Sequence, residues 1–310
     1  MAIAFLFPGQ GAQTPGFLAR LPAHPRVQAA LDEASAVLGR DARTLDTPQA
    51  LASTVGMQLS GLVAGVAVMR ALEAEGVEAD AVAGMSSGAY TAAVACGAIE
   101  FRDALKLLEL RARLMAEAYP HGYGLAAIVG LHEDRVRRLV AELDSPAQPL
   151  FLANLNAPTQ FVLAGSDGAL DQAIVAARQA GAGKALRMSV SVPSHCALME
   201  GVATRLQAAL AHVKLSPARI PYMGNVGARA LRDPLAIGLD LATNVARPVH
   251  WHDATSVLFE MGIRCFFEFP PGSVLTGLVH EAFDSVQARS LADTPLETVL
   301  YLAARSRRED

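Results

Sequence analysis

Apolar residues follow two patterns along the chain, short continuous runs and longer segments with helical spacing. The runs IAFLF near the N-terminus, AVAGM before Ser86 and RCFFEF in the last third are typical of buried strands. Helical periodicity covers residues 26–38, 50–75 and 101–118. After residue 195 we expect a helix to about residue 213, IPYMGNV as a strand and two further helices. This alternation predicts an α/β fold with a largely parallel sheet.

The middle of the chain follows a different order of elements. Its strand-like segments are GLAAIVGL, PLFLANL, QFVLAG and KALRMSVSV, and its helical segments are HEDRVRRLVAEL and DGALDQAIVAARQAG. The resulting β-α-β-β-α-β order is that of a ferredoxin-like domain. The sequence therefore predicts a ferredoxin-like small domain at residues 124–190. We expect it to be inserted into a discontinuous large α/β domain made of residues 1–123 and 191–310.

Composition and charge exclude several classes of partner. Of the 310 residues, 52% are hydrophobic and 18% are charged, so the chain can bury a large core. A net charge of −4 gives no general attraction for nucleic acid or an anionic membrane, and we expect neither partner. The most apolar segment, residues 59–79, includes Arg70 and Glu73, which predicts a buried amphipathic helix and no membrane span.

The N-terminus and the cysteines indicate a cytoplasmic protein. MAIAFLFPGQGAQ has no basic leader and is typical of the first core strand of a mature protein. The three cysteines, Cys96, Cys196 and Cys265, are scattered without metal-ligand spacing. They fit a reducing compartment, and we expect no metal site.

Ser86 is the first candidate for chemistry. Gly84-Met85-Ser86-Ser87-Gly88 fits G-x-S-x-G between an apolar strand and an Ala-rich helix, the context of a nucleophile elbow. Such a turn exposes the serine hydroxyl and directs the next backbone amide at a developing oxyanion. Small residues also occur at strand–helix junctions for packing alone. The motif by itself supports both interpretations equally.

A serine nucleophile needs a base, and the chain has eight histidines. His195 lies in SVPSHCALM, where a predicted strand gives way to a helix at the sheet edge at which α/β sites collect. Taken alone, this position slightly favours a histidine that merely begins a helix. His250 is the next candidate for the base.

Arg111 occupies an unusual place on the helix predicted at residues 101–118. It falls on the apolar stripe, between Leu108 and Met115. A buried guanidinium requires a strong acceptor. Two interpretations follow, a salt bridge to a buried carboxylate or a bidentate site for the carboxylate of a substrate.

Five segments together resemble one family. FPGQGAQ, GMSSGAY, LELRARLM, VSVPSHCALM and FPPGSVLTGL occur in the order and spacing of the malonyl-CoA:acyl-carrier-protein transacylases, and the resemblance covers nearly the whole chain. It implies a hydrolase-like α/β core with a ferredoxin-like small domain. It also implies transfer of a malonyl group from malonyl-CoA to the thiol of an acyl carrier protein through a malonyl-serine, with no permanently bound cofactor.

The resemblance also implies roles for individual residues. Ser86 would be the nucleophile, His195 its base and Arg111 the group that holds the malonyl carboxylate. The backbone amides of Gln10 and Ser87 would form the oxyanion hole. The main-chain carbonyl of Asn244 would orient the histidine, and the side chains of Gln58, Asn154 and Asn156 would line the site.

The chain departs from the usual family motif G-H-S-x-G-E at two positions, Met85 and Ala89. These replacements predict a drier site with the chemistry intact. G-apolar-S-x-G-A-Y, FLANLNAPTQFVLAGSD and LPAHP resemble the epsilon (MdcH-type) transacylase subunit of malonate decarboxylase. We therefore expect that branch, with other malonate decarboxylase subunits as partners. A malonyl transacylase of fatty-acid synthesis is the alternative.

Two further functions compete with acyl transfer to a carrier. A serine carboxylesterase would use the same elbow with Asp103, Asp134, Asp144 or Asp167, but it leaves Arg111 unexplained. A non-catalytic subunit would only dock a carrier protein through basic residues of the small domain. Those residues are Arg135, Arg137, Arg138, Lys184 and Arg187. A solvated face explains them more simply, and intact Ser86, His195 and Arg111 argue against a non-catalytic subunit.

Overall fold

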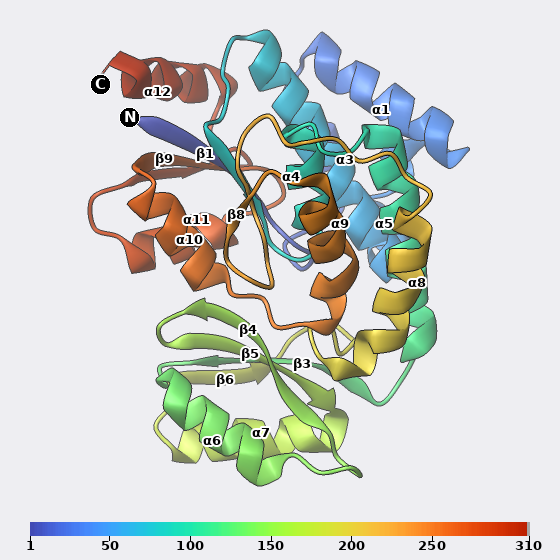
Figure 1. The fold of residues 1–310 in the computed structure, drawn as a ribbon, viewed down its shortest axis with the longest axis vertical. Coiled ribbons are helices and arrows are strands. Elements are labelled where there is room, and N and C mark those ends of the chain that lie inside the picture. Colours follow the sequence, from blue (N-terminus) through green and yellow to red (C-terminus); the bar gives the residue numbers. More distant parts are fainter. Residues whose placement is uncertain (309–310) are drawn as a thin grey trace.

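The computed structural model describes residues 1–308, and its larger part is built on a six-stranded sheet (Figure 1). The strands are β1 (Ala2–Phe7), β2 (Ala81–Gly84), β7 (Tyr222–Met223), β8 (Ala230–Leu231), β9 (Ile263–Glu268) and β10 (Gln287–Ser290). Their order is β10-β9-β1-β2-β7-β8, and all neighbours are parallel except β7 and β8. This confirms the predicted α/β fold with a largely parallel sheet.

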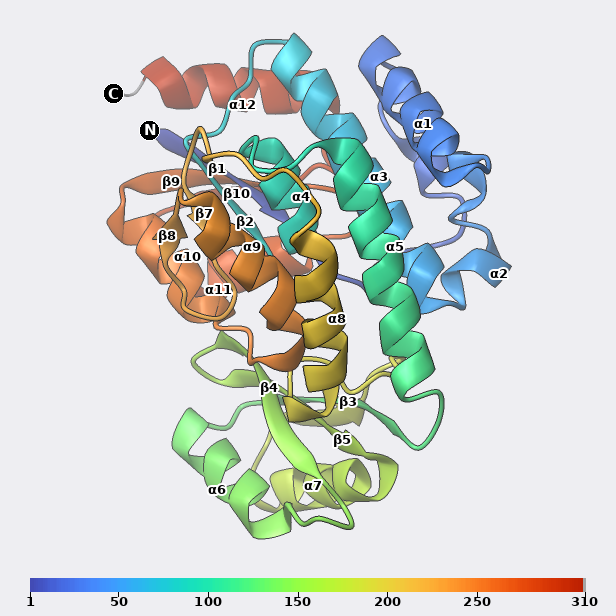
Figure 2. The ribbon, with the colours of Figure 1, turned by 45° about the vertical axis from the view of Figure 1, so that its right-hand side comes forward.

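Helices cover both faces of this sheet, as a parallel sheet requires (Figure 2). They are α1 (Pro25–Leu38), α2 (Pro48–Leu51), α3 (Thr54–Ala74), α4 (Gly88–Ala95), α5 (Phe101–Ala118), α8 (Glu200–Leu210), α9 (Pro234–Thr243), α10 (Trp251–Glu260), α11 (Val274–Ala282) and α12 (Leu296–Arg308). Side chains of β1 alternate between two cores. Phe5 and Phe7 point into the core that includes α3 and α5, whereas Ala4 and Leu6 pack with α10 and α11.

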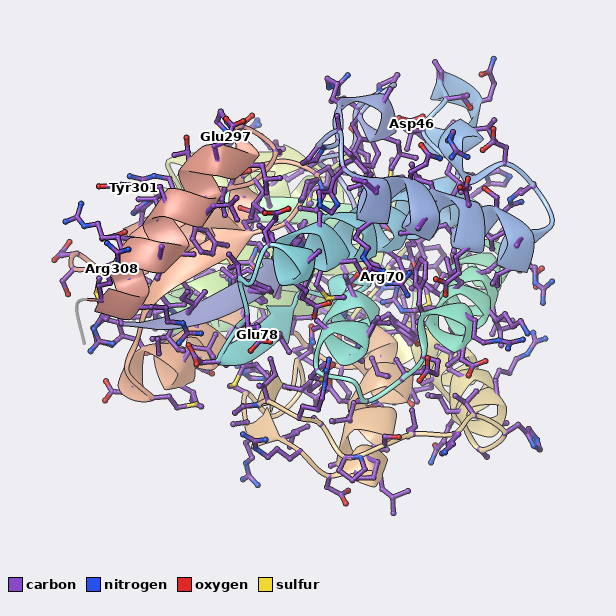
Figure 3. All side chains as sticks on the ribbon, turned by 90° about the horizontal axis from the view of Figure 1, so that it is seen from above. Asp46, Arg70, Glu78, Glu297, Tyr301 and Arg308 are labelled. Atoms are coloured by element: carbon purple, nitrogen blue, oxygen red, sulfur yellow. The ribbon has the colours of Figure 1, made fainter. Side chains whose placement is uncertain are left out.

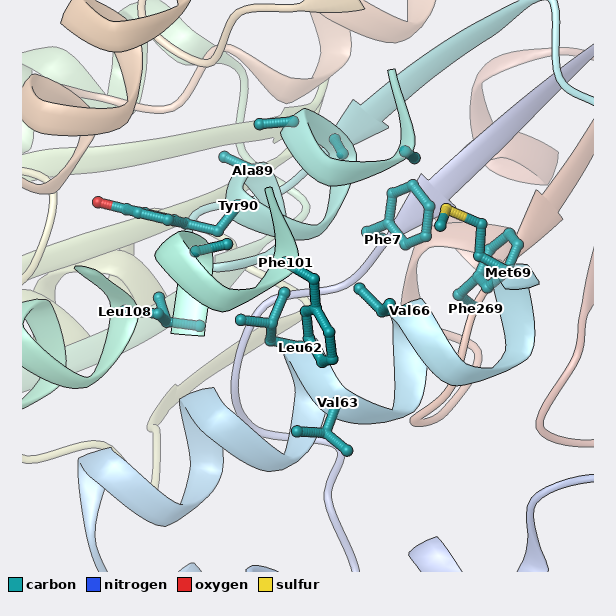
Figure 4. Packing of buried hydrophobic residues seen from close by; sticks show 14 of the residues in the cluster. Phe7, Leu62, Val63, Val66, Met69, Ala89, Tyr90, Phe101, Leu108 and Phe269 are labelled. Atoms are coloured by element: carbon teal, nitrogen blue, oxygen red, sulfur yellow. The ribbon is translucent and has the colours of Figure 1, made fainter. Parts of the chain in front are cut away.

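Helix α3 is enclosed by the rest of the protein. By length and composition it could cross a membrane, but 78% of its most apolar window is buried inside the structure. Figure 4 shows Val66 of α3 in the core with Phe7 and Phe101. The helix is therefore buried almost all round, where the sequence predicted an amphipathic one. Gly65 allows close packing on its inner face, because an added Cβ would lie 2.7 Å from the Thr91 methyl group and force that side chain to shift.

The second sheet is antiparallel and lies below the first in Figure 1. It contains β3 (Tyr123–Val129), β4 (Leu150–Ala157), β5 (Gln160–Ser166) and β6 (Lys184–Arg187) in the order β4-β5-β3-β6, and α6 (Glu133–Leu143) and α7 (Asp167–Gln179) share its core. This is the predicted ferredoxin-like arrangement. The division of the chain at residues 124–190 into a separate domain stays a prediction.

Several element boundaries differ from the sequence-based expectations. The helix expected at 50–75 is two helices, because Ser53 begins α3 as an N-cap, with its Oγ accepting from the Gly56 amide at 3.0 Å. KALRMSVSV leaves the sheet after Arg187, and IPYMGNV keeps only two strand residues. Strand β10 and helix α12 were not anticipated. Figure 3 shows Tyr301, which is 65% exposed, on the outer side of α12.

The two sheets are joined through β4. The Leu155 amide donates to the Val249 carbonyl, and the Val249 amide donates to the Ala153 carbonyl, both at 2.9 Å. Val249 follows the short 3₁₀ helix η4 (Asn244–Ala246) of the larger part. This connection fixes the small sheet against the carboxyl ends of the parallel strands, where β1 and β2 deliver the candidate site residues.

Candidate active site

Ser86 lies on a strained turn between β2 and α4. Its φ is +56°, a left-handed conformation that non-glycine residues rarely adopt. A Cβ added at Gly84 would lie 2.1 Å from the Gly88 carbonyl oxygen, and one added at Gly88 would lie 2.1 Å from the Phe7 carbonyl oxygen. Both positions therefore require glycine, which is the packing expected of a nucleophile elbow.

His195 lies next to Ser86. Its Nε2 is 2.8 Å from Ser86 Oγ, and its Nδ1 is 2.6 Å from the main-chain carbonyl oxygen of Asn244. A carbonyl only accepts, so Nδ1 carries the proton and Nε2 is free to accept from the serine hydroxyl. The two side chains, 109 positions apart in sequence, form a Ser–His pair oriented by the backbone.

The environment keeps His195 neutral. The side chain is 3% exposed, and burial together with the nearby charge of Arg111 lowers its pKa to about 4. A neutral imidazole can accept a proton at neutral pH, as a general base must.

Arg111 extends from α5 into the same site. Its Nη1 donates to Gln58 Oε1 at 2.8 Å, and its Nη2 approaches Ser86 Oγ at 3.2 Å and Asn244 Oδ1 at 3.4 Å. Its Nε is buried without a partner. Within residues 1–308 no carboxylate pairs with this fully buried guanidinium, so the salt-bridge interpretation is wrong for the part of the chain described. Burial lowers the pKa to about 10, which leaves the group charged at neutral pH.

Two backbone amides at the site have no partner of their own. Neither the Gln10 nor the Ser87 amide donates a hydrogen bond to another described residue. Both belong to segments that meet at the elbow, since a Cβ added at Gly9 would lie 3.1 Å from the Met85 carbonyl oxygen. Free amides in this position can stabilise a developing oxyanion.

A cavity of about 220 Å³ opens in front of Ser86, between the two sheets. The small sheet and the segment after it contribute an apolar wall formed by Leu125, Ala127, Val162, Met188 and Val190. Asn154 and Asn156 also line the cavity. Gln58, also expected to line the site, does not border this cavity. It links two parts of the site, because its amide nitrogen donates to Gln10 Oε1 at 3.0 Å while its oxygen accepts from Arg111.

The two residues that differ from the usual family motif, Met85 and Ala89, lie in different surroundings. Met85 lines the cavity, but Ala89 is fully buried in the main core and does not. A drier site can therefore be argued from Met85 alone. The alternative base, His250, is turned toward Asp253, with 3.2 Å between its Nδ1 and the carboxylate.

Sequence reasoning missed Asn225. It follows β7, the parallel neighbour of β2, and its 3% exposed side chain contacts the backbone of the elbow. The segment IPYMGNV was interpreted as strand throughout. The sequence offered one indication of its role, a polar residue at the carboxyl end of a predicted strand, where sites in α/β folds collect.

The geometry of the site defines a class of protein. A serine on an elbow, paired with a neutral histidine and close in the chain or the fold to two amides without partners among the described residues, is a site for acyl transfer. The chain matches the acyl transferase domain family over residues 4–302, and it belongs to that family.

Within this family, the chain is similar to individual malonyl transacylases. The chain is 38% identical over 294 residues to the malonyl CoA-acyl carrier protein transacylase of Salmonella typhimurium, covering 93% of this chain and 95% of the relative. It superposes with a TM-score of 0.91 and 36% identity on an acyl carrier protein S-malonyltransferase from Vibrio cholerae, covering 96% and 100% of the two chains. It also superposes on a malonyl-transacylase solved in complex with its type II PKS acyl-carrier protein. The TM-score is 0.92 and the sequence identity 35%, and the match covers 99% of this chain and 100% of the other.

Proposed function

We propose that this protein transfers a malonyl group from malonyl-CoA to the thiol of an acyl carrier protein through a malonyl-serine on Ser86. One observation carries the proposal. A fully buried guanidinium, with no carboxylate partner among residues 1–308, approaches the His195-paired hydroxyl to 3.2 Å. An acyl group that ends in a free carboxylate supplies the missing counter-charge.

In the first half-reaction, His195 Nε2 takes the Ser86 proton while Oγ attacks the thioester carbonyl carbon. The negative charge on the carbonyl oxygen is stabilised by the amides of Gln10 and Ser87. The intermediate collapses, the C–S bond breaks and CoA thiolate leaves with the proton from the imidazolium. Malonyl-serine remains, with its distal carboxylate on Arg111.

In the second half-reaction, the carrier thiol gives its proton to His195 and attacks the serine ester. Collapse breaks the Oγ–C bond and returns the proton to Ser86, so the sequence is ping-pong. Between the two steps the ester must be kept from water. The apolar wall and Met85 beside the ester support this part of the proposal.

The relatives favour the general malonyl transacylase over the malonate decarboxylase subunit. The expectation of a malonate decarboxylase subunit rested on local segments around Met85, Asn154 and the N-terminus. The relatives described above, which cover the chain almost end to end, are named for transfer to an acyl carrier protein. We therefore propose the alternative stated at the sequence level, a malonyl transacylase of fatty-acid synthesis, with a free acyl carrier protein as partner.

The competing functions are less well supported. A carboxylesterase was expected to orient its histidine with an aspartate, whereas His195 Nδ1 is held by a main-chain carbonyl. A subunit that only docks a carrier needs no Ser–His pair. Of the basic residues proposed for docking, Arg137 pairs with Glu133 and Arg187 with Asp167, which leaves this surface a prediction.

The test is intact-mass spectrometry of the purified chain after incubation with malonyl-CoA. We expect one malonyl group on Ser86, none on Ser86→Ala, and its loss when a carrier protein with its thiol prosthetic group is added. An adduct that survives in Ser86→Ala would overturn the nucleophile assignment. An adduct that water removes as fast as the carrier does would favour the esterase.

A further inference from the structure

We infer that Asn225 is a positioning residue that holds the nucleophile elbow in its strained conformation. Its carboxamide binds the backbone on both sides of Met85. The Ser86 amide donates to Asn225 Oδ1, and Asn225 Nδ2 donates to the Gly84 carbonyl oxygen, each at 2.8 Å. One side chain therefore satisfies an N–H and a C=O that the strand-to-helix turn would otherwise leave buried without partners.

The tether acts on the conformation that exposes the serine. A residue other than glycine stays in the left-handed conformation only where several surrounding contacts hold it there. Without the carboxamide, the Ser86 N–H has no acceptor to keep it pointing toward β7, and the residue can relax to negative φ. That rotation would move Oγ away from His195 Nε2, now at 2.8 Å.

Asn225 is itself fixed from its other side. The His250 amide donates to the Asn225 carbonyl at 2.9 Å, and the next amide, that of Val226, donates to Asp240 Oδ1 at 3.0 Å. The other oxygen of this buried carboxylate accepts from the Tyr222 hydroxyl at 2.7 Å. The loop after β7 is thus pre-organised by α9 and α10, and it presents the carboxamide in one orientation.

The hydrogen bonds of Asn225 also distinguish the Ser86 amide from the amides of Ser87 and Gln10. Because the Ser86 N–H is occupied by Asn225, it does not point at the cavity. The amides of Ser87 and Gln10 remain for an oxyanion. Asn225 does not line the cavity, so its effect on substrate passes through the position of Ser86.

This inference rests on the proposed function for its kinetic readout, but it can be tested without malonyl-CoA. We expect Asn225→Ala to lower kcat for malonyl transfer by about 100-fold, the loss that a displacement of about 1 Å at a reacting atom can cause. KM for malonyl-CoA should change much less. Labelling of Ser86 by an uncharged fluorophosphonate should slow in parallel. This second assay reports on the nucleophile even if the substrate is not malonyl-CoA.

Tyr222→Phe is the matched control. It removes the hydrogen bond from Tyr222 to Asp240 but leaves the bonds that hold the Asn225 backbone segment, from the amides of Val226 and His250, and both bonds of Asn225 to the elbow. We expect a lower Tm with labelling of Ser86 near that of the unchanged protein. If Asn225→Ala and Tyr222→Phe slow labelling equally, Asn225 only supports the fold and the inference is wrong.

Asn225→Asp provides a variant that is close to isosteric. A protonated carboxyl group can replace both bonds, donating to the Gly84 carbonyl and accepting from the Ser86 amide, whereas a carboxylate repels the Gly84 oxygen. Labelling relative to the unchanged protein should therefore rise as the pH falls from roughly 8 to 5, because protonation of a buried carboxyl restores the donor. A ratio independent of pH would contradict the inference.

Discussion

The guanidinium of Arg111 carries its charge in a fully buried position with only neutral oxygen acceptors around it. Gln58 holds one end of the group, and Ser86 and Asn244 approach the other. This arrangement fixes the cation beside the nucleophile without neutralising it. An uncharged acyl group would leave that charge without a counter-ion. Arg111 therefore selects against uncharged acyl groups as well as binding a carboxylate.

The protonation state of His195 leads to a prediction about pH. Because burial and Arg111 lower its pKa to about 4, kcat/KM for malonyl-serine formation should stay level down to roughly pH 5. A histidine with a pKa near 6.5 would instead lose about tenfold by pH 5.5. Stopped-flow or quenched-flow acylation across this range is the measurement, with His195→Ala as the control, expected to be about 10²–10⁴-fold slower. A titration near pH 6.5 would contradict the account.

The same pKa difference affects stability. The unfolded chain binds a proton on this histidine below roughly pH 6.5, whereas folded His195 does so only near pH 4. The contribution of this residue to the free energy of unfolding therefore falls as the pH drops through that window.

The candidate site residues that the sequence singled out share one property. Ser86 and His195 stand in short motifs at predicted strand ends, and Arg111 breaks a helical stripe, so each is visible in its own segment. Asn225 is visible only through its partner, because its role depends on β7 lying beside β2. Contacts between segments 139 positions apart are set by topology, which local patterns do not contain.

At the scale of elements, the elbow depends on how closely α4 approaches β1. We predict that Gly88→Ala lowers the free energy of unfolding by about 1–3 kcal/mol, since its Cβ would lie 2.1 Å from the Phe7 carbonyl oxygen and the backbone would have to shift. Malonyl transfer should fall as well, because the shift displaces Ser86. Urea unfolding and transfer kinetics measure the two effects.

Gly201→Ala is the matched control for this substitution. Gly201 lies in α8, and an added Cβ would meet nothing within 4 Å. The change should stabilise the protein by up to about 1 kcal/mol through helix propensity, with transfer unaffected. Similar losses in both variants would show that the close approach at Gly88 is unimportant.

Most helices and strands were predicted, but α12, with 13 residues, and the short strand β10 were not. Residues 101–118 were predicted as a helix and form α5 without change. The strand predicted at IPYMGNV keeps only the two residues of β7, and the four residues of β10 include the polar Gln287 and Arg289, which conceal it among loop residues. The break before α3 depends on the N-cap at Ser53. The helical periodicity of the residues on either side hid this break in the sequence.

At the scale of the whole molecule, the site exists because two sheets meet. The parallel sheet supplies the nucleophile, and the antiparallel sheet supplies an apolar wall of the cavity. The β-α-β-β-α-β order predicted the second sheet but not the face it turns to the first. That face follows from the bridge between Asn154 and Val249, a pairing between segments that sequence order does not reveal.

The acceptor tests the choice between branches of the family. If the general transacylase is right, kcat/KM for malonyl transfer should be much higher with the carrier protein of fatty-acid synthesis than with the carrier subunit of malonate decarboxylase. Each carrier is compared at equal concentration with its own thiol prosthetic group attached. A preference for the decarboxylase carrier would restore the interpretation first drawn from Met85 and its neighbours.

The most direct test of the account is kcat/KM for malonyl-CoA and acetyl-CoA in the unchanged protein and in Arg111→Ala. Truncating one member of a buried charge pair should cost malonyl transfer about 2–5 kcal/mol in transition-state free energy. The variant loses the contact of Arg111 with Ser86 Oγ but keeps the Ser86–His195 hydrogen bond and the oxyanion amides. Acetyl transfer should therefore hold steady or rise, because the unpaired charge is gone. Equal losses for the two thioesters would mean that Arg111 only braces the site, and the claim that it selects a carboxylate would be wrong.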